Sequence, residues 1–116
     1  MPKYIKADQF FYPQGIRQGG YLEIKDGKFG KVVNEVPADA EVINYTGYSI
    51  APGLVDTHIH GFGGVDVMDN NIEGTLHTMS EGLLTTGVTS FLPTTLTSSY
   101  ELLLAVTENI GARYKE

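Results

Sequence analysis

Two histidines separated by one residue, His58 and His60, are the side chains of this sequence best suited to chemistry. On a β-strand, side chains at positions i and i+2 point to the same face, whereas on a helix they would diverge by about 200°. Both imidazole rings can then reach one ion, and neutral imidazole is a good ligand for zinc, iron or manganese. Asp56 lies on the same face and is a candidate acceptor that would fix a ring tautomer. The spacing predicts part of a metal site, whose remaining ligands must come from another segment or another chain.

The alternative for such a pair is a half-exposed, hydrogen-bonded strand end that binds nothing. The neighbouring residues favour the metal. The pair closes a largely apolar strand candidate, residues 54–60, which opens after Pro52-Gly53 and is followed by a glycine-rich loop at 61–64. Parallel barrels place their catalytic residues at the carboxyl ends of such strands.

The elements around the pair alternate between strand and helix. Apolar residues at helical spacing predict a helix over residues 71–86, capped by Asn70 or Asn71, and residues 88–92 predict a second buried strand. Ser98 and Glu101 form a capping-box pattern that opens a second helix. The two apolar stripes consist of Ile72, Leu76, Met79 and Leu83, and of Leu103, Val106, Ile110 and Tyr114. A β-α-β-α order predicts parallel strands joined by crossovers, and two such units form only the start of an eight-unit barrel.

The first fifty residues are β-rich. Residues 21–25 alternate apolar and polar, Asp26-Gly27 supplies the positive backbone angles of a tight turn, and residues 29–33 make a return strand. We therefore predict two domains, a β-rich sandwich portion at 1–50 and a truncated α/β barrel portion at 51–116. The predicted sandwich core is aromatic: Tyr4, Phe10, Phe11, Tyr12, Tyr21, Phe29, Tyr45 and Tyr48.

Composition excludes several classes of function. The 116 residues carry a formal charge of -6 and no cysteine. The charge disfavours binding to nucleic acid or to acidic membranes, and the missing cysteines exclude disulfides and thiolate metal sites. No apolar stretch approaches the ~20 residues of a membrane span, and the start lacks a signal core, so we expect a cytoplasmic location.

Other polar residues are weaker candidates for a site. Asp66 and Asp69 precede a helix and are expected to stabilise its positive end. His77 falls outside the apolar stripe and is expected to face solvent. Thr94 lies in the loop after the second strand, where it is expected either to stabilise the turn or to line a substrate pocket. The glycines at 61–64 do not match a phosphate-binding fingerprint and predict a flexible strand-to-helix loop.

The segment 51–60, APGLVDTHIH, resembles the opening signature of the metal-dependent amidohydrolase superfamily. Residues 61–66, GFGGVD, and 86–94, TGVTSFLPT, look most like N-acetylglucosamine-6-phosphate deacetylases within that superfamily. The resemblance covers essentially the whole chain. It includes the β-rich leader, which is similar to the small β-sandwich domain that precedes the barrel in these enzymes.

The resemblance implies hydrolysis of the N-acetyl group of N-acetylglucosamine 6-phosphate, which yields glucosamine 6-phosphate and acetate. It implies that His58 and His60 are metal ligands and that the complete enzyme holds two divalent ions, zinc, iron or manganese. The general acid and base is expected beyond residue 116, so the chain by itself should be inactive. A shortened barrel would also expose apolar surface, which leads us to expect a homo-oligomer.

Two alternatives stay open at this point. One is a cyclic-amide hydrolase of the dihydroorotase or hydantoinase type, which shares the Pro-Gly-Leu-Val-Asp-x-His-x-His signature. The other is a non-enzymatic β-rich interaction module in which the histidines bind nothing. Substrate assays distinguish the first alternative from a deacetylase, and metal analysis distinguishes the second alternative from a metal-dependent enzyme.

Overall fold

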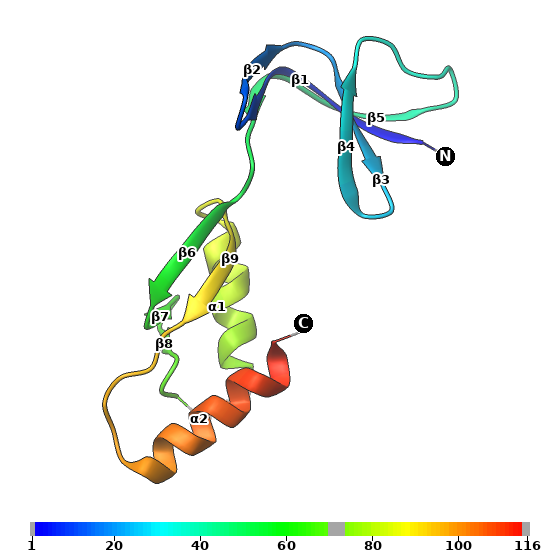
Figure 1. Cartoon of the computed structure of the whole chain (residues 1–116). Coiled ribbons are helices and arrows are strands. Elements are labelled where there is room, and N and C mark those ends of the chain that lie inside the picture. Colours follow the sequence, from blue (N-terminus) through cyan, green and yellow to red (C-terminus); the bar gives the residue numbers. More distant parts are fainter. Residues whose placement is uncertain (1, 70–73, 115–116) are drawn as a thin grey trace. The chain divides into compact units, whose positions relative to one another are not determined.

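The computed structural model describes residues 2–69 and 74–114. The chain divides into two compact units, Met1–Pro52 and Gly53–Glu116. The first unit contains strands β1 to β5, and the second contains the remaining strands and both helices (Figure 1). The chain is thus a mixed, strand-rich α/β protein.

The first unit is built on one five-stranded sheet. Its strands are β1 (Lys3–Tyr12), β2 (Gly15–Gln18), β3 (Tyr21–Lys25), β4 (Lys28–Val33) and β5 (Glu41–Ile50). Strand β5 runs parallel to β1 along one edge, whereas β3 and β2 pair antiparallel with the first and the last residues of β1. Strand β4 pairs with β3 and completes the sheet.

The predicted hairpin between β3 and β4 is confirmed. Lys25 pairs with Lys28, which leaves a two-residue turn of Asp26 and Gly27. Both turn residues have positive φ, 51° and 70°, as a type I′ turn requires. Asp-Gly is one of the few dipeptides that adopt this conformation at low cost, because aspartate tolerates it and glycine has no Cβ.

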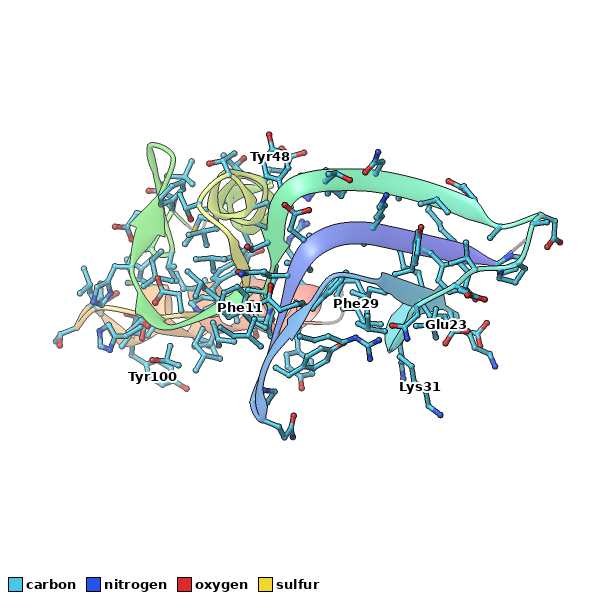
Figure 2. All side chains as sticks on the ribbon, turned by 90° about the horizontal axis from the view of Figure 1, so that it is seen from above. Phe11, Glu23, Phe29, Lys31, Tyr48 and Tyr100 are labelled. Atoms are coloured by element: carbon cyan, nitrogen blue, oxygen red, sulfur yellow. The ribbon has the colours of Figure 1, made fainter. Side chains whose placement is uncertain are left out.

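The aromatic core predicted for this unit is largely wrong. The buried cluster consists of Ala7, Phe10 and Leu22, and Tyr4 is also buried. Of the other predicted aromatics, Phe29 and Tyr48, labelled in Figure 2, are 69% and 66% exposed, and Phe11, Tyr12 and Tyr45 are also exposed. The physical reason is that the described strands of this unit form a single sheet, so no second sheet covers its outward side chains.

The second unit has the predicted β-α-β-α order. Its elements are β6 (Leu54–Ile59), β7 (Gly61–Phe62), β8 (Val65–Asp66), α1 (Thr75–Leu84), β9 (Val88–Pro93) and α2 (Tyr100–Arg113). Strands β6 and β9 pair in parallel, as Figure 1 shows, and α1 lies in the connection between them. This confirms the parallel pairing expected from the order of the elements.

The loop after the histidine pair is more ordered than predicted. Residues 61–66 form a short antiparallel hairpin, in which Gly61 pairs with Asp66 and Phe62 with Val65. A Cβ atom at Gly61 would collide with the carbonyl oxygen of Val65, so the two strands can approach closely only because residue 61 has no side chain.

One hydrophobic cluster holds the second unit together. Val67, Leu76, Met79 and Val106 are buried, and Ile59 of β6 and Phe91 of β9 pack against them. The cluster therefore joins both helices to the ends of the two parallel strands. It fixes the backbone from which the two histidines project.

The helix boundaries differ from the predictions at both N-termini. Leu76, Met79 and Leu83 are buried as predicted, but α1 begins at Thr75 after Gly74, and Asn70, Asn71 and Ile72 lie outside the described residues. Helix α2 is capped by Ser99, whose Oγ accepts a hydrogen bond from the backbone N–H of Leu102 at 3.2 Å, and the predicted cap Ser98 lies one residue earlier.

The strands and the last helix are less buried than predicted. Leu54 and Val55 of β6 and Leu92 of β9 are all more than half exposed, and so is Tyr114 after α2. In the described part of this unit, the helices pack against the side of the two strands that carries the hydrophobic cluster. No further described strand covers the remaining surface of β6 and β9. The described residues contain two helices, α1 and α2. Neither of them is long and apolar enough to cross a membrane.

Candidate metal centre

The two histidines lie together at the carboxyl end of β6. His58 is in the strand and His60 follows its last residue, Ile59. Their Nε2 atoms are 3.2 Å apart, and the ring centroids are 5.0 Å apart with the planes at 79°. His58 is exposed and His60 is half-buried. The strand alternation therefore directs both rings to one side, as their spacing predicts.

A backbone carbonyl orients the His60 ring. Nδ1 of His60 lies 2.9 Å from the carbonyl oxygen of Thr94, which follows β9. A carbonyl oxygen can only accept a hydrogen bond, so Nδ1 carries the proton of the neutral ring. The Nε2 atom of His60 then keeps its lone pair and faces His58.

The His58 ring has a simpler environment. Its Nε2 contacts Nε2 of His60, and because the latter is the acceptor, His58 donates the proton of this contact. Binding of an ion between the two rings requires His58 to adopt its other tautomer, which frees this lone pair. The exposure of His58 allows that exchange with solvent.

Asp56 does not play the part expected of it. Its Oδ1 accepts a hydrogen bond from the backbone N–H of His58 at 3.1 Å, a local turn-like contact that competes with any interaction with a ring. The Thr94 carbonyl is the ring acceptor instead. Thr94 is 34 residues from His60 in sequence, so no local pattern identifies this partner, although the parallel pairing of β6 and β9 brings their carboxyl ends to one edge.

The spacing of the two nitrogens fits a shared metal ion. Two nitrogen ligands that each lie about 2.1 Å from a tetrahedral ion are separated by about 3.4 Å. The observed separation of the Nε2 atoms is 3.2 Å. Within residues 2–69 and 74–114, no group of three or more His, Asp or Glu side chains is arranged to hold a metal ion. The described residues therefore offer two candidate ligands, and a complete metal site would need further donors.

The other candidate residues have structural partners. Asp66 Oδ1 accepts a hydrogen bond from the Met68 N–H at 2.8 Å, and Asp69 Oδ2 accepts one from the Asp66 N–H at 2.7 Å. The two carboxylates thus stabilise the turn after β8 rather than the start of the helix. His77 is exposed, as predicted, and lies 3.5 Å from Glu81 on the next turn of α1. None of these three side chains forms a hydrogen bond or ion pair with His58 or His60.

Comparison with known sequences finds deacetylases of two amino-sugar phosphates. No family model matches the chain. The N-acetylglucosamine-6-phosphate deacetylase of Bacillus subtilis strain 168 is 40% identical in an alignment of 86 positions that covers 72% of this chain and 22% of the relative. The N-acetylgalactosamine-6-phosphate deacetylase of Escherichia coli O157:H7 is 30% identical in an alignment of 117 positions, gaps included, that covers 97% of this chain and 29% of the relative. The chain thus spans between a fifth and a third of the length of these relatives.

A dihydroorotase shares a shorter region. The enzyme of Bacillus cereus strain B4264 is 55% identical over 40 residues, which are 34% of this chain and 9% of the relative. The match to deacetylases therefore extends over much more of the chain than the match to the cyclic-amide hydrolase.

A solved structure shares the fold of the whole chain. The N-acetylglucosamine-6-phosphate deacetylase from Pasteurella multocida superimposes with a TM-score of 0.89 over 100% of this chain and 31% of that protein, at 24% sequence identity. The solved structure adds the shared fold, and the sequence relatives confirm the resemblance to N-acetylglucosamine-6-phosphate deacetylases that the signature around His58 and His60 indicates.

Proposed function

We propose that the chain is the metal-holding part of an enzyme that hydrolyses N-acetylglucosamine 6-phosphate to glucosamine 6-phosphate and acetate. The observation that carries the proposal is the histidine pair, whose Nε2 atoms lie 3.2 Å apart with the tautomer of His60 fixed by Thr94. Similarity to deacetylases over most of the chain supports the choice of substrate.

His58 and His60 would hold a divalent ion through their Nε2 atoms. When bound, such an ion lowers the pKa of a coordinated water and polarises the amide carbonyl. The chain's own contribution is to present the Nε2 lone pair of His60 from a rigid strand end, together with that of His58 once His58 has adopted its other tautomer. The hydrophobic cluster around Met79 contacts Ile59, so the backbone between the two ligands is fixed by packing. We further propose that the complete enzyme holds two ions, zinc, iron or manganese.

The reaction needs groups that the described residues do not provide near the pair. The acetyl carbon gains the oxygen of water, the bond from this carbon to nitrogen breaks, and the departing nitrogen needs a proton. A general acid must deliver that proton. We propose that this group, the remaining metal ligands and the phosphate-binding residues follow Glu116 in the complete enzyme, and that the chain alone is inactive.

The fold supports a particular place for the chain in that enzyme. Its second unit has the order β6, α1, β9, α2 with parallel strands, and the histidines lie at the carboxyl end of β6, where barrels of alternating strands and helices carry their sites. We propose that residues 51–116 form the first two units of an eight-unit barrel. Residues 1–50 would be a portion of a β-sandwich, whose other sheet would cover Phe29 and Tyr48.

A chimera tests the proposal. The chain replaces the matching segment of the Bacillus subtilis deacetylase, and release of acetate from N-acetylglucosamine 6-phosphate is measured. We expect activity, and we expect His58→Asn or His60→Asn to lower it by more than about 100-fold, because loss of a ligand costs more than loss of its outer-shell partner. His77→Asn is the matched control and should stay within about twofold. A folded chimera that is inactive, or one that tolerates His58→Asn, contradicts the proposal.

The isolated chain is the complementary test. Purified 116-residue protein should release no acetate when zinc, iron or manganese is added. Metal-dependent deacetylation by this chain would show that it contains a complete site, and the proposed division of the enzyme would be wrong.

A cyclic-amide hydrolase is the second candidate, favoured by the dihydroorotase similarity over 40 residues. The same chimera assayed with dihydroorotate distinguishes the two, since we expect turnover of the acetylated sugar phosphate alone. Assay of the galactosamine epimer separates the two sugar substrates that the relatives represent.

A further inference from the structure

Thr94 is joined to the end of β6 by both its backbone and its side chain. Its N–H donates to the carbonyl oxygen of Ile59 at 2.8 Å, and its Oγ1 accepts from the N–H of Ile59 at 3.2 Å. Its carbonyl oxygen accepts from Nδ1 of His60 at 2.9 Å. Thr94 therefore contacts both Ile59, the last residue of β6, and His60, which directly follows it.

The Thr94 hydroxyl lies between the two strands where their register is irregular. The register between β6 and β9 shifts between Asp56 and Ile59, and Ile59 is then paired with Pro93. The hydroxyl accepts from Ile59 and donates to the carbonyl oxygen of Leu92 at 3.1 Å, so its proton and one lone pair are both used. The side chain thus bridges the two strands where their main-chain pairing ends.

We propose that Thr94 is a positioning residue for His60. Its hydroxyl holds the Thr94 peptide against β6, and the carbonyl of the same residue then receives the Nδ1 proton of His60. This fixes the tautomer that leaves the Nε2 lone pair of His60 facing His58. The effect on metal binding rests on the proposed function, whereas the effect on the tautomer stands independently of it.

The first test measures the tautomer without any metal. Nitrogen-15 NMR of the imidazole rings of the full 116-residue chain is recorded at alkaline pH, where the rings are neutral, and signals are assigned with His58→Asn and His77→Asn. We expect the His60 proton on Nδ1. A wild-type His60 that carries its proton on Nε2 overturns the proposal, and this result does not depend on any Thr94 variant.

Substitutions at Thr94 then test the hydroxyl. Thr94→Val keeps the shape but removes the hydroxyl, so the proton of His60 should redistribute between Nδ1 and Nε2. Thr94→Ser keeps the hydroxyl and should retain the wild-type tautomer, and Thr95→Val is the matched control in the same loop. A folded Thr94→Val variant with an unchanged tautomer overturns the role of the hydroxyl. If Thr94→Val does not fold, loss of the Nδ1 tautomer in Thr94→Ser has the same consequence.

The last measurement connects the tautomer to the metal. Isothermal titration with Zn²⁺ should show that Thr94→Val weakens binding about 10-fold or more, as expected for an outer-shell partner, while Thr94→Ser stays within about twofold. An unchanged Zn²⁺ affinity in Thr94→Val contradicts the positioning role. A wild-type chain that binds no Zn²⁺ contradicts the metal role of the histidines instead, and the tautomer measurement still decides the role of Thr94.

Discussion

Replacing Met79 by alanine should destabilise the second unit and loosen the site. Met79 of α1 is fully buried, in the cluster against which Ile59 and Phe91 pack. Truncation removes about three buried heavy atoms, a transfer loss of about 2.4 kcal/mol at about 0.8 kcal/mol per group. The cavity that remains adds to this loss, and measured costs of such truncations are about 2–5 kcal/mol. A unit of this size is stabilised by only about 3–10 kcal/mol, so a large part of its stability would be lost.

Leu84→Ala is the matched control, because Leu84 lies on the same helix and is 58% exposed. Its effect should stay within about 0.5 kcal/mol. Both described helices belong to the second unit, so urea unfolding followed by helical circular dichroism reports on that unit. Equal costs for Met79→Ala and Leu84→Ala would refute the position of the core. In Met79→Ala, weaker Zn²⁺ binding should accompany the lower stability, because the cluster supports Ile59 between the two histidines.

Three further outcomes follow from the same structure. Ser99→Ala removes the hydroxyl that accepts from the Leu102 N–H at the start of α2, so it should lower the free energy of unfolding by about 1 kcal/mol in the same measurement. An unchanged unfolding midpoint would show that this cap is unimportant. Gly111→Ala lies within α2 with open space around the added Cβ, so it should raise stability by about 0.5–1 kcal/mol, whereas a loss would place residue 111 in a contact. Sedimentation at several concentrations should reveal species larger than a monomer, since Leu54, Val55 and Leu92 are exposed, and a monomer at every concentration would contradict self-association.

Local chemistry was sufficient to predict several elements. The hairpin follows from Asp26-Gly27, because few dipeptides adopt that turn, and α1 follows from apolar residues at helical spacing. The histidine pair was predictable for the same reason, since alternation along a strand is a property of neighbouring residues.

Contacts between distant segments were not predictable in this way. The partner of His60 is a backbone carbonyl, which every residue has, so the acceptor itself does not distinguish position 94 in the sequence. Asp56 was the expected partner because it is close in sequence, yet its carboxylate is satisfied by the nearer N–H of His58. The exposure of Phe29 and Tyr48 depends on whether a second layer covers the sheet, and an aromatic residue in a strand carries no information about that layer.

The close approach of β7 and β8 at Gly61 has a consequence for mutational scanning of this segment. Every side chain introduced there meets the Val65 carbonyl oxygen, so all nineteen replacements should impair the hairpin that begins directly after the second histidine. In a growth-based screen, position 61 should therefore be about as intolerant as positions 58 and 60, although it contributes no ligand. Measuring protein abundance beside growth would separate the two kinds of intolerance, because defects at 61 should deplete folded protein whereas His58→Asn should leave its amount unchanged.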